Sequence, residues 1–167
     1  MFYVLLYIIL SFSFFAFAGT NQHKAHSHGA ATLSIAFDGL KGKLVLEAPS
    51  ESIYGFEYIA KTKADLLKQK KALATLKESM SDMVVLENKL NCKFLNQKIE
   101  IEQQKNHATV ESVFDILCDL DPTGSTIHFN VQKSFPDLKN IQVQVLIGDM
   151  QKSIEVKKNG VSAELKK

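Results

Sequence analysis

Residues 31–49, ATLSIAFDGLKGKLVLEAP, carry the clearest structural signal in this chain. Leu33, Ile35 and Phe37 alternate with small or polar residues, so they share one face of an extended strand. Asp38-Gly39 and Lys41-Gly42 supply turn residues, and the apolar residues 44–46 resume a strand that Pro49 ends. The stretch therefore predicts a β-hairpin.

A helical pattern follows the hairpin. Thr62 is typical of a helix N-cap, and Asp65 stands three residues later, as in a capping box. Apolar residues then recur at spacings of seven, three, four and three, at Leu66, Leu73, Leu76, Met80 and Met83. The pattern predicts one long helix. The lysines among them, which are Lys68, Lys70, Lys71 and Lys77, form either an anion-binding patch or a solvated helix face, and the sequence favours the solvated face.

Beyond the helix the apolar period returns to two, which indicates strands. The inward sets are Leu90, Cys92 and Phe94; Val110, Phe114, Ile116 and Cys118; Ile127, Phe129 and Val131; Ile141, Val143, Val145 and Ile147; and Ile154 and Val156. Strands in series joined by short turns imply antiparallel pairing. The predicted fold class is α+β, an antiparallel sheet with one long helix packed on it.

The two cysteines, Cys92 and Cys118, fall in the inward phase of predicted strands. In an oxidising compartment an even pair predicts one disulfide, here pinning two strands in the core. The alternative is a pair of zinc ligands, which favours close spacing such as Cys-x-x-Cys. These cysteines are 26 positions apart, so the sequence favours the disulfide.

Residues 1–18 contain no charged side chain and end in Ala16-Phe17-Ala18. They predict a cleaved signal peptide, with an uncleaved anchor as the alternative, and they are short for a bilayer span. Residues 19–30 then form a histidine-containing mature N-terminal segment, and residues 31–167 are expected to form a single α+β domain. The net charge of +2 and the lack of a basic stripe disfavour a nucleic-acid partner.

The mature N-terminal segment holds His23, His26 and His28, three of the five histidines in the chain. Neutral imidazole binds zinc, copper and nickel, and three imidazoles plus water or a carboxylate complete a tetrahedral zinc site. The histidines therefore predict metal binding. The competing interpretation is a polar terminus that happens to contain histidines, and ligand type alone does not separate zinc from copper.

His107 and His128 are weaker candidates. His107 directly precedes a predicted strand, where a ligand and an ordinary loop residue are equally compatible with the pattern. His128 alternates with the apolar Ile127 and Phe129, so it faces solvent or a groove. The chain has no Gly-x-Ser-x-Gly elbow, P-loop or dinucleotide fingerprint, and an enzyme is not expected.

The order in which several motifs follow one another along the chain resembles that of a known family. His26-Ser27-His28-Gly29 runs into the hairpin, Gly55-Phe56-Glu57 leads into the lysine- and leucine-rich helix, and the two cysteines follow. This order resembles the ZrgA-like family of bacterial periplasmic zinc-uptake proteins. The resemblance implies a secreted, non-enzymatic zinc accessory protein, and it carries over Glu57 as a candidate ligand or a partner of a ligand. The alternative for Glu57 is a surface carboxylate beside a packed Phe56.

The chain departs from the family pattern at two places. Tyr58 stands where the family segment continues with histidine, and the loop expected at Asn96–Asn106, where many members carry a histidine-rich insertion, has no histidine. The resemblance therefore implies reduced zinc capacity.

The leading hypothesis is a periplasmic protein that buffers zinc or delivers it to a component of an uptake transporter, without membrane attachment once the signal is removed. His23, His26 and His28 would be the primary ligands, completed from Glu57, His107 and His128. The alternative is a metal-free secreted module that adds a partner strand to an exposed sheet edge. A third possibility, an enzyme that uses the zinc as a Lewis acid, has no support in the sequence.

Overall fold

The computed structural model describes residues 30–166. The predicted hairpin is confirmed: β1 (Ala30–Asp38) and β2 (Lys41–Pro49) pair antiparallel, with Asp38 opposite Lys41. Gly42 is needed here because Phe37 packs across the partner strand. A Cβ at Gly42 would lie 2.6 Å from Phe37 Cδ1.

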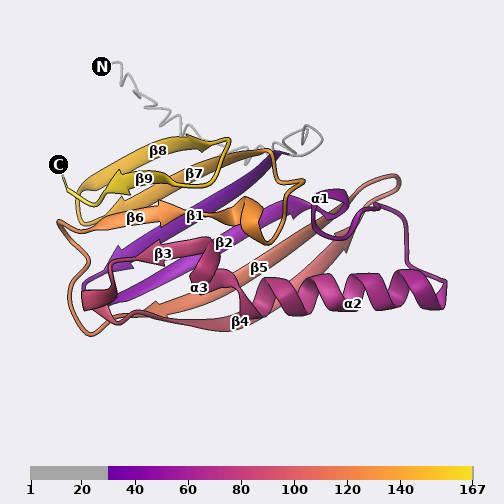
Figure 1. Ribbon diagram of the computed structural model, residues 1–167, viewed down its shortest axis with the longest axis horizontal. Coiled ribbons are helices and arrows are strands. Elements are labelled where there is room, and N and C mark those ends of the chain that lie inside the picture. The colour runs from indigo at the N-terminus through magenta and orange to yellow at the C-terminus, as the bar shows by residue number, and fades with distance from the viewer. Residues whose placement is uncertain (1–29, 167) are drawn as a thin grey trace, which may run out of the picture.

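The hairpin forms the centre of a six-stranded sheet with the order β4-β5-β2-β1-β7-β8 (Figure 1). The other members are β4 (Lys93–Gln103), β5 (Ala108–Leu117), β7 (Asn140–Ile147) and β8 (Met150–Val156). The prediction of a wholly antiparallel sheet is wrong at one junction, because β1 and β7 run parallel. These strands are joined by a long excursion of the chain, which is the kind of connection that a parallel pair requires.

Residues 30–166 also form a second, antiparallel sheet with the order β3-β6-β9. Its strands are β3 (Val84–Leu86), β6 (Thr126–Phe129) and β9 (Val161–Glu164), and short 3₁₀ helices occur at Asn88–Leu90 and Val131–Lys133. Ile127 and Phe129 of β6 belong to the same buried cluster as Leu33 and Ile35 of β1. The protein is therefore mainly β, with a core shared by two sheets rather than a single sheet.

Three α-helices lie within the described residues: α1 (Ser50–Tyr54), α2 (Lys63–Glu78) and α3 (Met80–Met83). The predicted N-cap is confirmed, since Thr62 Oγ1 accepts a hydrogen bond from the Asp65 N–H at 3.1 Å. The predicted single long helix is wrong in extent: α2 ends before Ser79, and the two methionines belong to α3.

The expected packing of the helix is confirmed only in part, through the buried Leu76 and the partly buried Ala72 and Leu73. Leu76 is the single buried residue of α2, and Leu66, which the periodicity assigns to the buried face, is 49% exposed. Leu73 packs only partly against the core. Even α2, the longest helix of residues 30–166, lacks the length and apolar character that a membrane span requires.

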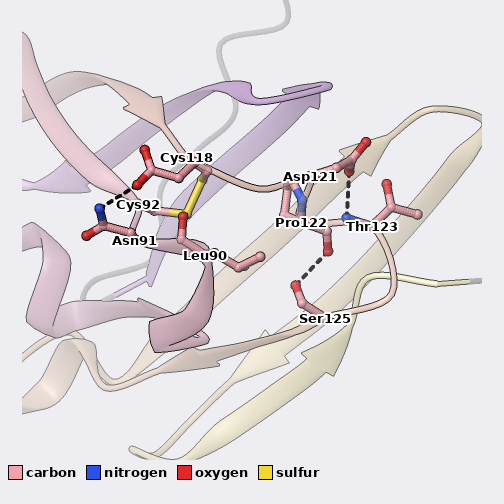
Figure 2. Close-up of a disulfide and its surroundings, with 9 residues drawn as sticks. Leu90, Asn91, Cys92, Cys118, Asp121, Pro122, Thr123 and Ser125 are labelled. Carbon is pink, nitrogen blue, oxygen red and sulfur yellow. Dashed lines mark hydrogen bonds between the residues drawn. A yellow bond between two sulfur atoms is a disulfide. The ribbon is translucent and has the colours of Figure 1, made fainter.

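The predicted disulfide between Cys92 and Cys118 is present (Figure 2). The cysteines lie just outside the strands rather than within them, because β4 begins at Lys93 and β5 ends at Leu117. The bond therefore closes the open end of the β4–β5 hairpin. Hydrogen bonds from Asn91 Nδ2 to Asp119 Oδ2 (2.6 Å) and from the Asp119 N–H to the Leu90 carbonyl (2.9 Å) join the same two segments.

Removing the disulfide should destabilise the fold without changing it. We expect the Cys92→Ala/Cys118→Ala double variant to lose about 2–4 kcal/mol of unfolding free energy, because the bond restricts the unfolded chain across a separation of 26 residues. Urea denaturation followed by circular dichroism measures the change, with the reduced parent protein as the control. An unchanged midpoint would contradict this role.

Candidate metal site

Two of the predicted site residues, Glu57 and His107, meet in the structure. His107 Nδ1 lies 2.8 Å from Glu57 Oε2, although the residues are 50 positions apart. The imidazole side chain is 65% exposed and the carboxylate side chain is 17% exposed. The pair therefore presents an accessible imidazole backed by a largely shielded carboxylate.

Glu57 owes its position to the end of α1. Gly55 ends this helix in the left-handed conformation with φ 87°, which glycine adopts without steric penalty, and its N–H donates to the Glu51 carbonyl at 2.8 Å. The buried Ser50 hydroxyl then donates to the Phe56 carbonyl at 2.7 Å. Phe56 is buried, so Glu57 emerges from an anchored segment.

His107 lies at the tip of the β4–β5 hairpin, directly before β5 as predicted. The region expected to be a loop, Asn96–Asn106, is different: most of it is strand β4, and the connection is confined to residues 104–107. The Gln104 N–H donates to the His107 carbonyl at 2.7 Å, which closes this short turn. The imidazole is thus carried by a tight turn rather than by a long loop.

A residue that the sequence did not identify, Gln103, joins the two halves of the site. Its side-chain Nε2 donates to the Glu57 carbonyl at 2.9 Å and lies 3.2 Å from the His107 carbonyl. It also contacts the Gln104 carbonyl at 2.9 Å. One amide group therefore connects the backbone of both members of the pair. A glutamine near the end of an exposed strand carries no sequence signal for this role.

The pair can contribute to a metal site in two ways. Both side chains can bind the ion directly, through imidazole nitrogen and carboxylate oxygen. Alternatively, the carboxylate can orient the imidazole, as in carboxylate–histidine–zinc triads, where the carboxylate holds one ring nitrogen and the other binds the metal. Among residues 30–166, no group of three or more His, Cys, Asp and Glu side chains is arranged to hold a metal ion. A complete site would need ligands from elsewhere.

The register of the sheet places the start of β1 at the same end as this pair. Pro49 of β2 pairs with Thr109 of β5, two residues after His107. The β1–β2 register sets Thr32 opposite Glu47, so Ala30 is level with Pro49 when the register is continued by two residues. Two strand spacings, about 10 Å, separate Ala30 from Thr109. His23, His26 and His28 precede Ala30 and lie outside the described residues.

His128 lies elsewhere. It is an exposed residue of β6 in the three-stranded sheet, as its alternation with buried neighbours predicted. Its charge makes a small contribution to the lowered pKa of Glu87, which hydrogen bonds from the Lys89 side chain and the Thr126 N–H lower more strongly. His128 therefore does not form a three-ligand group with Glu57 and His107 among the described residues.

The Glu57–His107 pair supplies at most two ligands, an exposed imidazole and the carboxylate that contacts it. Residues 25–165 of the chain match the family described as ZrgA family zinc uptake protein, and the chain belongs to this family. The resemblance seen in the sequence is thus confirmed. The matched range includes His26 and His28 and begins after His23. No curated protein matches the chain.

The Gln103 contacts predict a local effect. We expect Gln103→Ala to speed hydrogen exchange of the Gln104 amide by up to about tenfold, because the loss of one hydrogen-bonding group costs about 0.5–1.5 kcal/mol. Exchange measured by NMR tests this, with Gln97→Ala as the control, since Gln97 is an exposed residue of the same strand. Equal protection in the two variants would show that Gln103 does not hold the turn.

Proposed function

We propose that the protein is a periplasmic, non-enzymatic zinc-binding protein that buffers the ion or delivers it to an uptake system. Its ligands are imidazoles of His23, His26 and His28 together with the Glu57–His107 pair. The observation that carries the proposal is the 2.8 Å contact between Glu57 and His107, at the end of the sheet where the histidine segment joins β1. The family assignment supports zinc uptake as the setting.

Chain reach makes this combination feasible. An extended chain spans about 3.3–3.6 Å per residue, so His28 can lie up to about 7 Å from Ala30 and His26 up to about 14 Å. The separation across two strands at this end of the sheet is about 10 Å. The histidine segment is therefore long enough to bring at least one imidazole to the pair.

The exposure of the pair suits an ion that is exchanged. Structural zinc sites are closed and saturated by protein ligands, whereas a site on the surface leaves room for an incoming or outgoing ligand. With His107 65% exposed, a second protein can approach the ion directly. This supports zinc as cargo rather than as a permanent structural element.

The alternative, a module that adds a partner strand, is less well supported. Of the two edge strands of the six-stranded sheet, β4 carries Lys93, Lys98, Glu100 and Glu102, and its register shifts between Asn96 and Lys98. The other edge strand, β8, carries Lys152 and Glu155. Charged side chains and a β-bulge are devices that discourage pairing at a sheet edge. The metal site therefore explains the Glu57–His107 pair better than strand addition does.

Zinc titration calorimetry on residues 19–167 tests the proposal. We expect the His23→Ala/His26→Ala/His28→Ala variant to lose measurable tight binding, and Glu57→Gln and His107→Ala each to lower the affinity by about 10–100-fold. His128→Ala is the matched control and should bind as the parent does. Equal binding by the triple variant and the parent would remove the histidine segment from the site. No binding by the parent would refute the zinc proposal.

The affinity should also depend on pH. Metal ligation requires neutral imidazole, and an unperturbed imidazole titrates near pH 6.5, so protons compete with zinc as the pH falls below this value. We expect the affinity of the parent to fall by at least about tenfold between pH 7.5 and pH 5.5. An affinity that stays constant over this range would contradict imidazole ligation.

A further inference from the structure

The outward surface of α2 carries exposed leucines among its lysines, and a helix that only faces solvent does not need these leucines. Six exposed residues follow one another at helical spacing on the side away from the buried Leu76: Lys63, Leu66, Leu67, Lys70, Ala74 and Lys77. We call this set the outer face of α2. Leu66 is 49% exposed and Leu67 is 68% exposed. None of the six residues is acidic, and the exposed Glu78 borders the face at the end of the helix.

The helix stands at the margin of the molecule (Figure 1). A groove of about 270 Å³ is lined by residues of α1, of α2 and of the segment 134–137. A surface helix of a globular protein normally turns its apolar stripe toward the core. Here the two leucines of the first helical turns point away from it, so the domain's own packing does not explain them.

The segment that joins the metal site to α2 contacts the helix through Asp65, which lies on the same side of α2 as the buried Leu76. The segment between Glu57 and α2 exposes two more large apolar side chains, Tyr58 at 58% and Ile59 at 62%. Tyr58 stacks on Phe56 with ring centroids 4.6 Å apart, and its hydroxyl donates to Asp65 Oδ1 at 3.3 Å. Partial desolvation raises the pKa of Tyr58, and the charge of Asp65 and the hydrogen bond to it raise this pKa further. Tyr58 therefore links the Glu57 segment to the start of α2.

We propose that the outer face of α2 docks a second protein whose surface has an apolar groove bordered by carboxylates. Charge complementarity selects this occupant, because Lys63, Lys70 and Lys77 line the face and its apolar side chains flank them. Helices that present anchors at spacings of three, four and seven residues bind grooves of this kind. This inference rests on the proposed function in one respect: the docked protein is the one that receives the zinc.

Two other occupants fit the face less well. A membrane-surface helix has one continuous apolar sector opposite its charges, whereas here the lysines lie between Leu66 and Leu67 around the helix. A second copy of the chain could offer the row of Glu47, Glu111 and Glu100 on neighbouring strands. These carboxylates already have partners: Lys98 Nζ contacts Glu100 Oε2 at 2.8 Å and Glu111 Oε1 at 3.0 Å, and Thr32 Oγ1 donates to Glu47 Oε2 at 3.2 Å.

Site-specific photo-crosslinking in the native host tests the docking surface. A benzoylphenylalanine replaces Leu67 in the full-length chain, and the same residue at Leu146 is the matched control, since Leu146 is an exposed leucine of β7. We expect a discrete protein adduct from position 67 and none from position 146. The adduct should fall by at least about tenfold when Lys63→Glu, Lys70→Glu and Lys77→Glu are added, because like charges then face each other.

Two further variants test whether the loss of the adduct is caused by misfolding of the charge-reversal variant. Lys63→Ala, Lys70→Ala and Lys77→Ala together should also weaken the adduct while favouring the helix, since alanine has the highest helix propensity. Leu66→Ser should also weaken the adduct, and it leaves the net charge unchanged. Circular dichroism checks that each variant is folded. The crosslinked partner peptide should be apolar and flanked by Asp or Glu residues.

Several outcomes would overturn the docking proposal. They are equal adducts at positions 67 and 146, an adduct that survives charge reversal, an adduct with a second copy of the chain, or lysine-dependent flotation with phosphatidylcholine–phosphatidylglycerol vesicles.

Zinc calorimetry on the charge-reversal variant separates the docking proposal from the zinc-binding proposal. Unchanged zinc affinity with a lost adduct supports a docking surface distinct from the metal site. A position-67 adduct in a protein that fails to bind zinc would preserve docking and refute zinc binding.

Discussion

The pairing of β1 with two neighbours, antiparallel with β2 and parallel with β7, is the interaction on which the rest of the structure depends. Alternate residues of β1, Leu33 and Ile35 among them, are almost fully buried between the two sheets, and each such side chain contributes about 1.5–3 kcal/mol through burial. A slip of one residue in this register would turn the buried set outward. The register therefore determines both where the core lies and which end of the sheet receives the chain that precedes Ala30.

The candidate metal site follows from that arrangement. The left-handed Gly55 and the buried Ser50 hydroxyl direct Glu57 out of the segment after α1, and a short turn carries His107 toward it. Gln103 then joins the two backbones. Disulfide and site occupy opposite ends of the same hairpin: the cysteines close its open end, and the imidazole lies at its tip. A hairpin secured at one end can present a ligand at the other with little loss of conformational entropy on binding.

The distribution of charge separates the surfaces of the molecule. Carboxylates on β2, β4 and β5 lie in one row across the six-stranded sheet, and the Glu100 and Glu111 side chains raise the pKa of the Lys98 that bridges them. The outer face of α2 carries lysines and leucines instead. The accessible imidazole of His107 stands near the segment that leads into α2, and metal binding and protein docking are proposed for separate surfaces.

The sequence by itself determined the features that depend on neighbouring residues: the hairpin from alternation and turn chemistry, the Thr62 N-cap, the exposure of His128, and the membership in a zinc-uptake family. It also identified the disulfide partners, since two cysteines leave one pairing. Tertiary structure alone decided the parallel union of β1 and β7, the division of the predicted long helix, the outward position of Leu66, and the meeting of Glu57 with His107 through Gln103. Hydrophobic periodicity and helix capping depend on residues within a few positions of one another. The contacts that tertiary structure decided join segments tens of residues apart. Their free energy depends on how the whole chain reverses direction and packs.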